Sequence, residues 1–147
     1  MIAILILGIT LGAILFALTT SAVTADALRD NTIAAGLAQE GIEVVRNIRD
    51  NEWLSGSGPY GSAFPAGQYE LQWNDPALTL ASSLRFLKKD PATGLFSYDA
   101  GTATIFKRRI VVETVSDAES RITVYIEWSN RGADKVLEAE EHLFNWY

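Results

Sequence analysis

The pattern of hydrophobic and polar positions divides the chain into an apolar first segment and a polar remainder. Residues 1–25 contain no charged residue, no His, Asn or Gln and no Pro, and the first charge is Asp26. As an α-helix this segment would extend ~37 Å, compared with the ~30 Å hydrocarbon core of a bilayer. The pattern therefore predicts a helix that can lie in a membrane, followed by a polar domain.

Helical periodicity continues beyond the first charge. No Pro occurs between residues 25 and 53, and apolar positions between 33 and 48 recur every three or four residues. This spacing predicts one helix from near Met1 to about Asp50 with an amphipathic second half. Glu43 and Arg46, three apart, predict an attractive pair on its surface. We expect the apolar face to pack on the domain that follows, through Ile33, Leu37, Val44, Val45 and Ile48.

After the helix, a loop rich in Ser, Gly and Pro (residues 55–66) precedes strand-like runs. Residues 68–73, 105–115 and 121–129 are alternating or rich in β-branched residues, and residues 135–146 close the chain. Residues 84–88 and 95–98 flank a turn-rich segment, 89–94, which predicts a hairpin. The last three strands predict an antiparallel meander whose apolar face the helix covers.

The sequence therefore predicts an α+β fold, with a long N-terminal helix packed on an antiparallel β-sheet head domain. We assign residues 1–25 to the apolar half of the helix, 26–53 to its amphipathic half and 54–147 to the β head domain. Four tryptophans are predicted to lie in the core or at its edge, namely Trp53, Trp73, Trp128 and Trp146.

Composition and charge narrow the classes of function. The chain has 12 Lys+Arg against 18 Asp+Glu, a net charge of −6, which argues against strong nucleic-acid binding. We interpret the basic run 107–109 as a solvated strand edge. The absence of Cys excludes disulfides, thiolate zinc sites and a cysteine nucleophile.

Residues with catalytic potential form no recognisable arrangement. His142 is the single histidine, and no spacing supplies a nucleophile for it. Glu138, Glu140 and Glu141 predict a solvated strand face rather than a calcium cage, because no turn geometry accompanies them. No phosphate loop, zinc motif or nucleophile elbow is present. We therefore expect no catalytic residues, no cofactor, no metal and no enzymatic activity.

Three interpretations of the apolar start are open. A cleaved secretory signal would need a basic region, and none precedes Ile2. An ordinary membrane anchor normally has Lys or Arg at its cytoplasmic end, which is missing here. The third is a helix that begins in a membrane and ends inside a protein assembly. Gly8 and Gly12 form a G-x-x-x-G, which lets helix backbones approach closely.

Three stretches resemble one family: MIAILILG at residues 1–8, LAQEGIEVVRNIRD at 37–50, and LFNW at 143–146. With the apolar-then-amphipathic helix, they resemble type IV pilins and pseudopilins. The resemblance implies a subunit held in the inner membrane, extracted by the pilus assembly machinery and added to a helical homopolymer. It implies that residues 8–20 unwind on assembly. The residues expected to pack in the filament core are Ile2, Leu5, Gly8, Gly12, Leu15 and Phe16.

The chain departs from the family at one position. Family members carry a glutamate at the fifth mature residue, whereas Leu5 occupies that count here and Glu40 is the first glutamate. Either this pilin lacks the glutamate or the sequence begins inside the mature protein, and we favour the second because MIAILIL aligns better just after the glutamate than before it.

The expected function is that of a structural subunit of a type IV pilus or similar extracellular filament, used for adhesion, motility or uptake. The alternatives are a minor pilin or pseudopilin of a secretion or DNA-uptake machine, and a membrane-tethered β binding domain.

Overall fold

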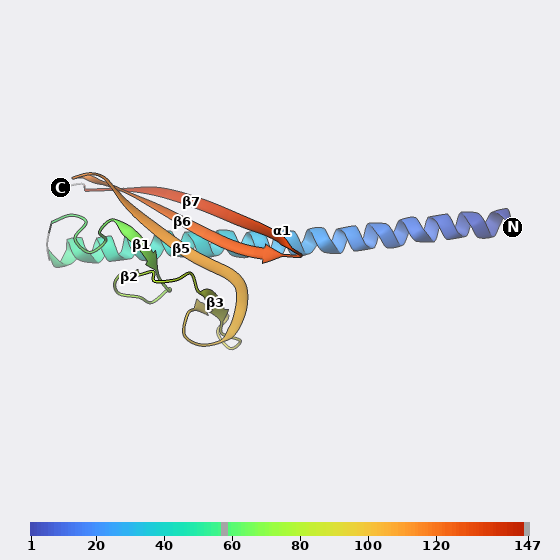
Figure 1. Cartoon of the computed structure of the whole chain (residues 1–147), viewed down its shortest axis with the longest axis horizontal. Helices are drawn as coiled ribbons and strands as arrows, with labels where there is room; N and C mark the ends of the chain where they lie inside the picture. The colour runs from blue at the N-terminus through green and yellow to red at the C-terminus, as the bar shows by residue number, and fades with distance from the viewer. Residues whose placement is uncertain (57–58, 146–147) are drawn as a thin grey trace. The chain divides into compact units, whose positions relative to one another are not determined.

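The computed structural model describes residues 1–56 and 59–145, and of Ile4, Leu5, Ile6 and Ile9 it describes the backbone alone. One helix, α1 (Ile2–Ser55), precedes an antiparallel sheet (Figure 1). The described strands are β1 (Gly67–Glu70), β2 (Thr79–Leu80), β3 (Phe86–Lys89), β4 (Phe96–Ser97), β5 (Thr102–Ser116), β6 (Glu119–Asn130) and β7 (Ala133–Phe144). The α+β class with its long first helix is confirmed. Contacts divide the chain into two units, Met1–Ile33 and Ala34–Tyr147.

Helix α1 runs past its predicted end near Asp50, because residues 51–55 contain no helix breaker. Gly56 is the first residue to adopt a left-handed backbone, with φ of 59°, and its N–H bonds to the Trp53 carbonyl at 3.2 Å. A glycine in this conformation is a common helix end because it lacks the Cβ that would clash. Pro59 then prevents the helix from resuming.

The part of α1 that belongs to the second unit buries one face. Its buried residues are Ala34, Leu37, Ala38, Gly41, Val44, Val45, Ile48 and Glu52, which follow a helical period. At Gly41 the helix and sheet come closest, since a Cβ there would lie 3.1 Å from Val124 Cγ1 and 3.4 Å from Ile110 Cδ1. The predicted covering of the sheet by the amphipathic half of the helix is therefore observed.

The meander predicted for the last three strands is also confirmed. β5 pairs with β6 from Phe106↔Trp128 to Ser116↔Glu119, and β6 pairs with β7 along their whole length, all antiparallel. Arg131 and Gly132 join β6 to β7, with φ of 54° and 79°. Two positive φ values are typical of the type I′ turn, whose twist suits a tight hairpin.

Shorter strands extend the sheet on the other side of β5. β1 and β3 both pair with β5, β2 pairs with β1, and β4 pairs with β3. The β3–β4 pair is the predicted hairpin, and Figure 1 shows β3 in a lobe away from α1.

The strand predicted for residues 68–73 is wrong at its end, because β1 stops at Glu70. The Asp75 side chain accepts a hydrogen bond from the Gln72 N–H at 2.9 Å, and this local bond replaces a ladder bond. Trp73, predicted to be core or core edge, is 48% exposed as a result. Trp128 is buried as predicted, Trp53 is half-buried, and Trp146 lies outside the described residues.

Candidate functional site

The first unit presents exposed apolar side chains. Most are more than half exposed: Ile2 78%, Leu15 57% and Phe16 74%. A Cβ added at Gly8 or Gly12 would meet no atom within 4 Å. Leu5, also predicted to pack in a filament core, has a side chain outside the described residues. Exposed apolar surface of this extent marks a membrane or protein interaction site.

Hydroxyl groups within this segment are satisfied by the helix itself. Thr19 Oγ1 and Thr20 Oγ1 donate to the Phe16 carbonyl at 2.9 and 3.0 Å, and Ser21 Oγ donates to the Ala17 carbonyl at 2.8 Å. Such bonds lower the cost of placing a hydroxyl in an apolar environment, where no water is present to pair with it. The segment is therefore suited to lipid or to a dry protein interface despite its polar residues.

Among the described residues, α1 is the one helix long and apolar enough to cross a membrane. Its exposed apolar half has the length that a hydrocarbon core requires. The sequence-based expectation of a segment that can lie in a membrane is thus supported at this coarse level.

The residues predicted for helix-to-sheet packing fall in both units. Leu37, Val44, Val45 and Ile48 are buried, at most 8% exposed, in the unit that contains the sheet. Ile33 is the last residue of the first unit and is only partly buried. The second half of α1 is therefore a component of the folded domain's core.

Arg108 contradicts the interpretation of residues 107–109 as a solvated strand edge. β5 is an interior strand, and the Arg108 side chain is fully buried. Its Nη1 donates to the Leu37 carbonyl at 3.0 Å and to Glu40 Oε1 at 2.8 Å, and its Nη2 donates to the Leu71 carbonyl. The alternation along β5 could have revealed this. Side chains two residues apart lie on the same face of a strand, so Arg108 lies on the same face as the buried Phe106 and Ile110.

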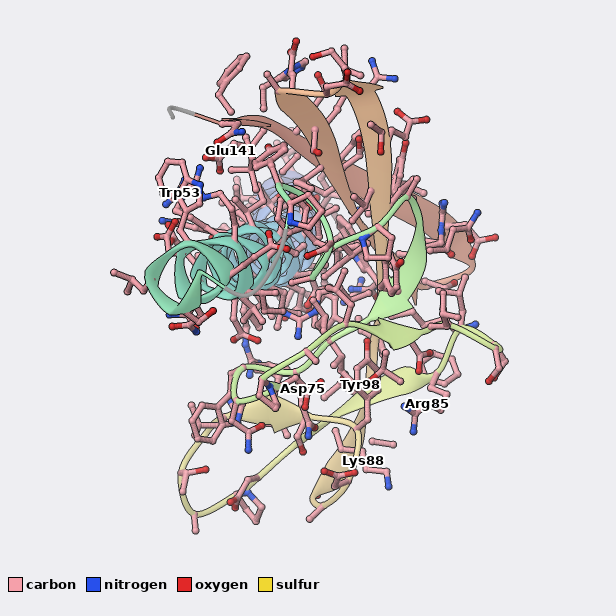
Figure 2. All side chains as sticks on the ribbon, turned by 90° about the vertical axis from the view of Figure 1, so that its left-hand side faces the viewer. Trp53, Asp75, Arg85, Lys88, Tyr98 and Glu141 are labelled. Carbon is pink, nitrogen blue, oxygen red and sulfur yellow. The ribbon has the colours of Figure 1, made fainter. Side chains whose placement is uncertain are left out.

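Charged side chains form pairs on both faces of the meander. Arg46 of α1 binds Glu141 of β7 with its Nη2 at 2.6 Å from Oε1 and also binds Glu43, as the spacing predicted. Figure 2 shows Glu141 beside the helix. His142 lies between Glu119 and Glu140, with ring nitrogens 2.6 and 3.2 Å from their oxygens.

These contacts raise the pKa of His142, chiefly through its bond to Glu119 and then through Glu140. In the described part of the chain no group of three or more His, Asp or Glu residues is placed to hold a metal ion.

The chain was compared with protein-family models, with curated proteins and with solved structures, and no match was found in any of the three.

Proposed function

We propose that this chain is the structural subunit of a type IV pilus-like filament, and that it polymerises through the first half of α1. The observation that carries the proposal is the change of environment along one helix. The described side chains of its first half are exposed and mostly apolar, while its second half is built into the core of a sheet domain. The resemblance of residues 1–8 and 37–50 to pilins supports the same proposal.

In this proposal the exposed apolar half of α1 is shielded from water in two successive environments. Lipid covers it before assembly, and equivalent helices of other copies cover it in the fibre. A contact between different surfaces of identical subunits generates a helical polymer when the repeated rotation does not close into a ring. Burial of ~1000 Å² of apolar surface would contribute ~25 kcal/mol before the entropy costs of association.

The test is substitution of a glycine at which an added Cβ would not be crowded by the described atoms. A Cβ at Gly12 would meet no atom within 4 Å, so we expect the Gly12→Leu subunit itself to fold and insert normally. Gly36→Leu is the matched control, because Gly36 is equally uncrowded but lies outside the apolar segment. Both variants are expressed in cells that assemble pili, and sheared filaments are quantified by electron microscopy and immunoblotting.

We expect Gly12→Leu to reduce filament yield about tenfold or more, because Leu prevents close approach of helix backbones. Gly36→Leu should retain filaments. Equal yields from the two variants would refute packing through Gly12. Absence of the unmodified chain from any filament would favour the membrane-tethered binding domain instead. A copy number confined to filament tips would indicate a minor pilin.

A further inference from the structure

A groove in the second unit lies between α1 and the segment Trp73–Pro76. Its volume is about 520 Å³, within the ~300–1000 Å³ usual for ligand sites. Asn47 and Asn51 line it from successive turns of the helix, and Trp73, Asn74 and Asp75 line it from the segment that follows β1. Figure 2 shows Asp75 next to the helix. One wall is thus regular helix and the other a turn.

Trp73 gives the groove an apolar surface. It is 48% exposed, although tryptophan side chains are usually highly buried. The turn that begins at Gln72 holds it there, since the Gln72 N–H bonds to Asp75. The Gln72 side chain is itself fixed, because its Oε1 accepts from the Tyr98 N–H at 3.1 Å and its Nε2 donates to Asp99 at 3.0 Å. The turn that carries the indole is therefore tied to the region around β4.

The hydrogen-bonding groups of the groove include neutral amides. Asn51 Nδ2 donates to Asn47 Oδ1 at 2.9 Å, which leaves an Asn47 amide nitrogen to donate and an Asn51 carbonyl oxygen to accept. Asn74 adds a third amide at the opposite wall. Groups that both donate and accept, set beside an aromatic face, match a ligand with several hydroxyls and an apolar C–H face.

The charges of the groove select against anions. Its ionised lining residues are all acids, with no Lys or Arg among them. Glu40 and Glu43 are paired, with Oε1 atoms 2.8 Å from Arg108 Nη1 and 2.6 Å from Arg46 Nη1. Asp75 accepts from its own turn. Two of the three carboxylates are thus paired with arginines, and the lack of a cationic side chain in the lining disfavours an acidic ligand.

We propose that this groove binds a neutral pyranose carbohydrate, with one sugar face against Trp73 and its hydroxyls bonded to Asn47, Asn51 and Asn74. The proposal does not depend on filament assembly, because every residue of the groove lies in the second unit. A filament would present the groove in many copies and would raise avidity for a surface that carries several sugars.

The test uses the full chain in lipid nanodiscs, which avoid sugar-based detergents. Methyl glycosides of glucose, galactose and mannose are titrated to ~50 mM and followed by saturation-transfer NMR, because one groove of this kind predicts a Kd of about 1 mM. Glucuronic acid is the anionic comparison. The variants are Trp73→Ala, Trp73→Phe and Asn47→Ala. Phe86→Ala is the matched control, since Phe86 is 51% exposed and lies outside the groove.

At least one glycoside should bind saturably, and Trp73→Ala should weaken its binding about tenfold or more. Trp73→Phe should retain part of the affinity, Asn47→Ala should weaken it, and Phe86→Ala should leave it unchanged. The proposal is overturned if none of the three glycosides binds, if Trp73→Ala binds as tightly as the unmodified chain, or if glucuronic acid binds more tightly than the glucoside.

Discussion

Two buried carboxylates hold segments that have little regular structure. Glu52, at the end of α1, accepts hydrogen bonds from the Gly61 N–H at 3.2 Å and the Ala63 N–H at 2.7 Å, and from the Ser62 hydroxyl. Glu70, at the end of β1, accepts from the backbone N–H of Arg85 at 3.0 Å and from its Nε at 2.8 Å. Charged acceptors make stronger bonds than neutral ones, so each carboxylate offsets its own burial while it orders a loop.

His142 should make stability depend on pH. Its pKa is raised above the unfolded value of about 6.5 by Glu119 and then Glu140, so the folded chain binds the proton more tightly. The resulting stabilisation is fully present below the unfolded pKa and is lost as pH rises through the folded pKa. We expect the urea midpoint to fall between about pH 5.5 and about pH 8.5 by more than it does in His142→Gln.

Because the chain has one histidine, its ring protons give an unambiguous NMR titration. Glu119→Gln should move the pKa of His142 back towards the ordinary value. An unshifted titration in the unmodified chain would show that the contacts with Glu119 and Glu140 do not persist in solution.

The elements with a clear hydrophobic period were predictable from the sequence, and the irregular ones were not. The helix face from Leu37 to Ile48 and the alternation of β6 follow directly from spacings of 3.6 and 2. The β6–β7 turn was predictable from the polar residues around Gly132. By contrast, the end of β1 depends on a side chain, Asp75, that competes with the ladder. A hydrogen bond from a side chain to the nearby backbone leaves no periodic pattern of apolar residues in the sequence.

The candidate surface on the first half of α1 was predictable because an uncharged apolar run is visible in composition alone. The groove beside Trp73 was not, because a tryptophan on the apolar face of an alternating run normally indicates core. Arg108 was misplaced for a related reason. Its charge was given more weight than its position on the buried face of the strand. A buried arginine is tolerated where carbonyls and a carboxylate accept its hydrogen bonds.

Arg108 joins three elements, so its loss should destabilise the sheet domain strongly. It bonds to α1 through Leu37 and Glu40 and to the segment after β1 through Leu71. Arg108→Met preserves apolar volume but leaves the Leu71 carbonyl without this donor. Breaking a buried ion pair costs about 3–5 kcal/mol, and the 28% exposure of the Glu40 side chain lowers the expected loss to about 2–4 kcal/mol.

Urea unfolding monitored by near-ultraviolet circular dichroism measures this loss. Arg109→Met is the control from the same strand, since the Arg109 side chain is 26% exposed and contacts Tyr125 and Glu127 on the outer face. It should cost less than about 1 kcal/mol. Similar losses in the two variants would mean that the Arg108 bonds contribute no more than a surface contact.

At the scale of the whole molecule, the two units differ in what they need from their surroundings. The buried apolar residues among those described begin at Ala34, so the core belongs to the second unit. The first unit has exposed apolar side chains that require lipid or other copies. We therefore expect the sheet domain to fold independently of what covers the apolar helix.

This separation predicts that a fragment of residues 26–147 folds without the apolar segment. It retains every buried apolar residue described and keeps an additional stretch of helix before Ala34, where fraying has little effect. We expect a soluble monomer by analytical ultracentrifugation, with a urea midpoint equal to that of the full chain in nanodiscs. The fragment should form no filaments and should not join filaments of the full chain, because it lacks the surface proposed to polymerise. If the fragment aggregated or unfolded at a lower urea concentration, residues 1–25 would contribute to the fold itself, and the apolar helix could not be treated as a surface reserved for lipid and neighbouring subunits.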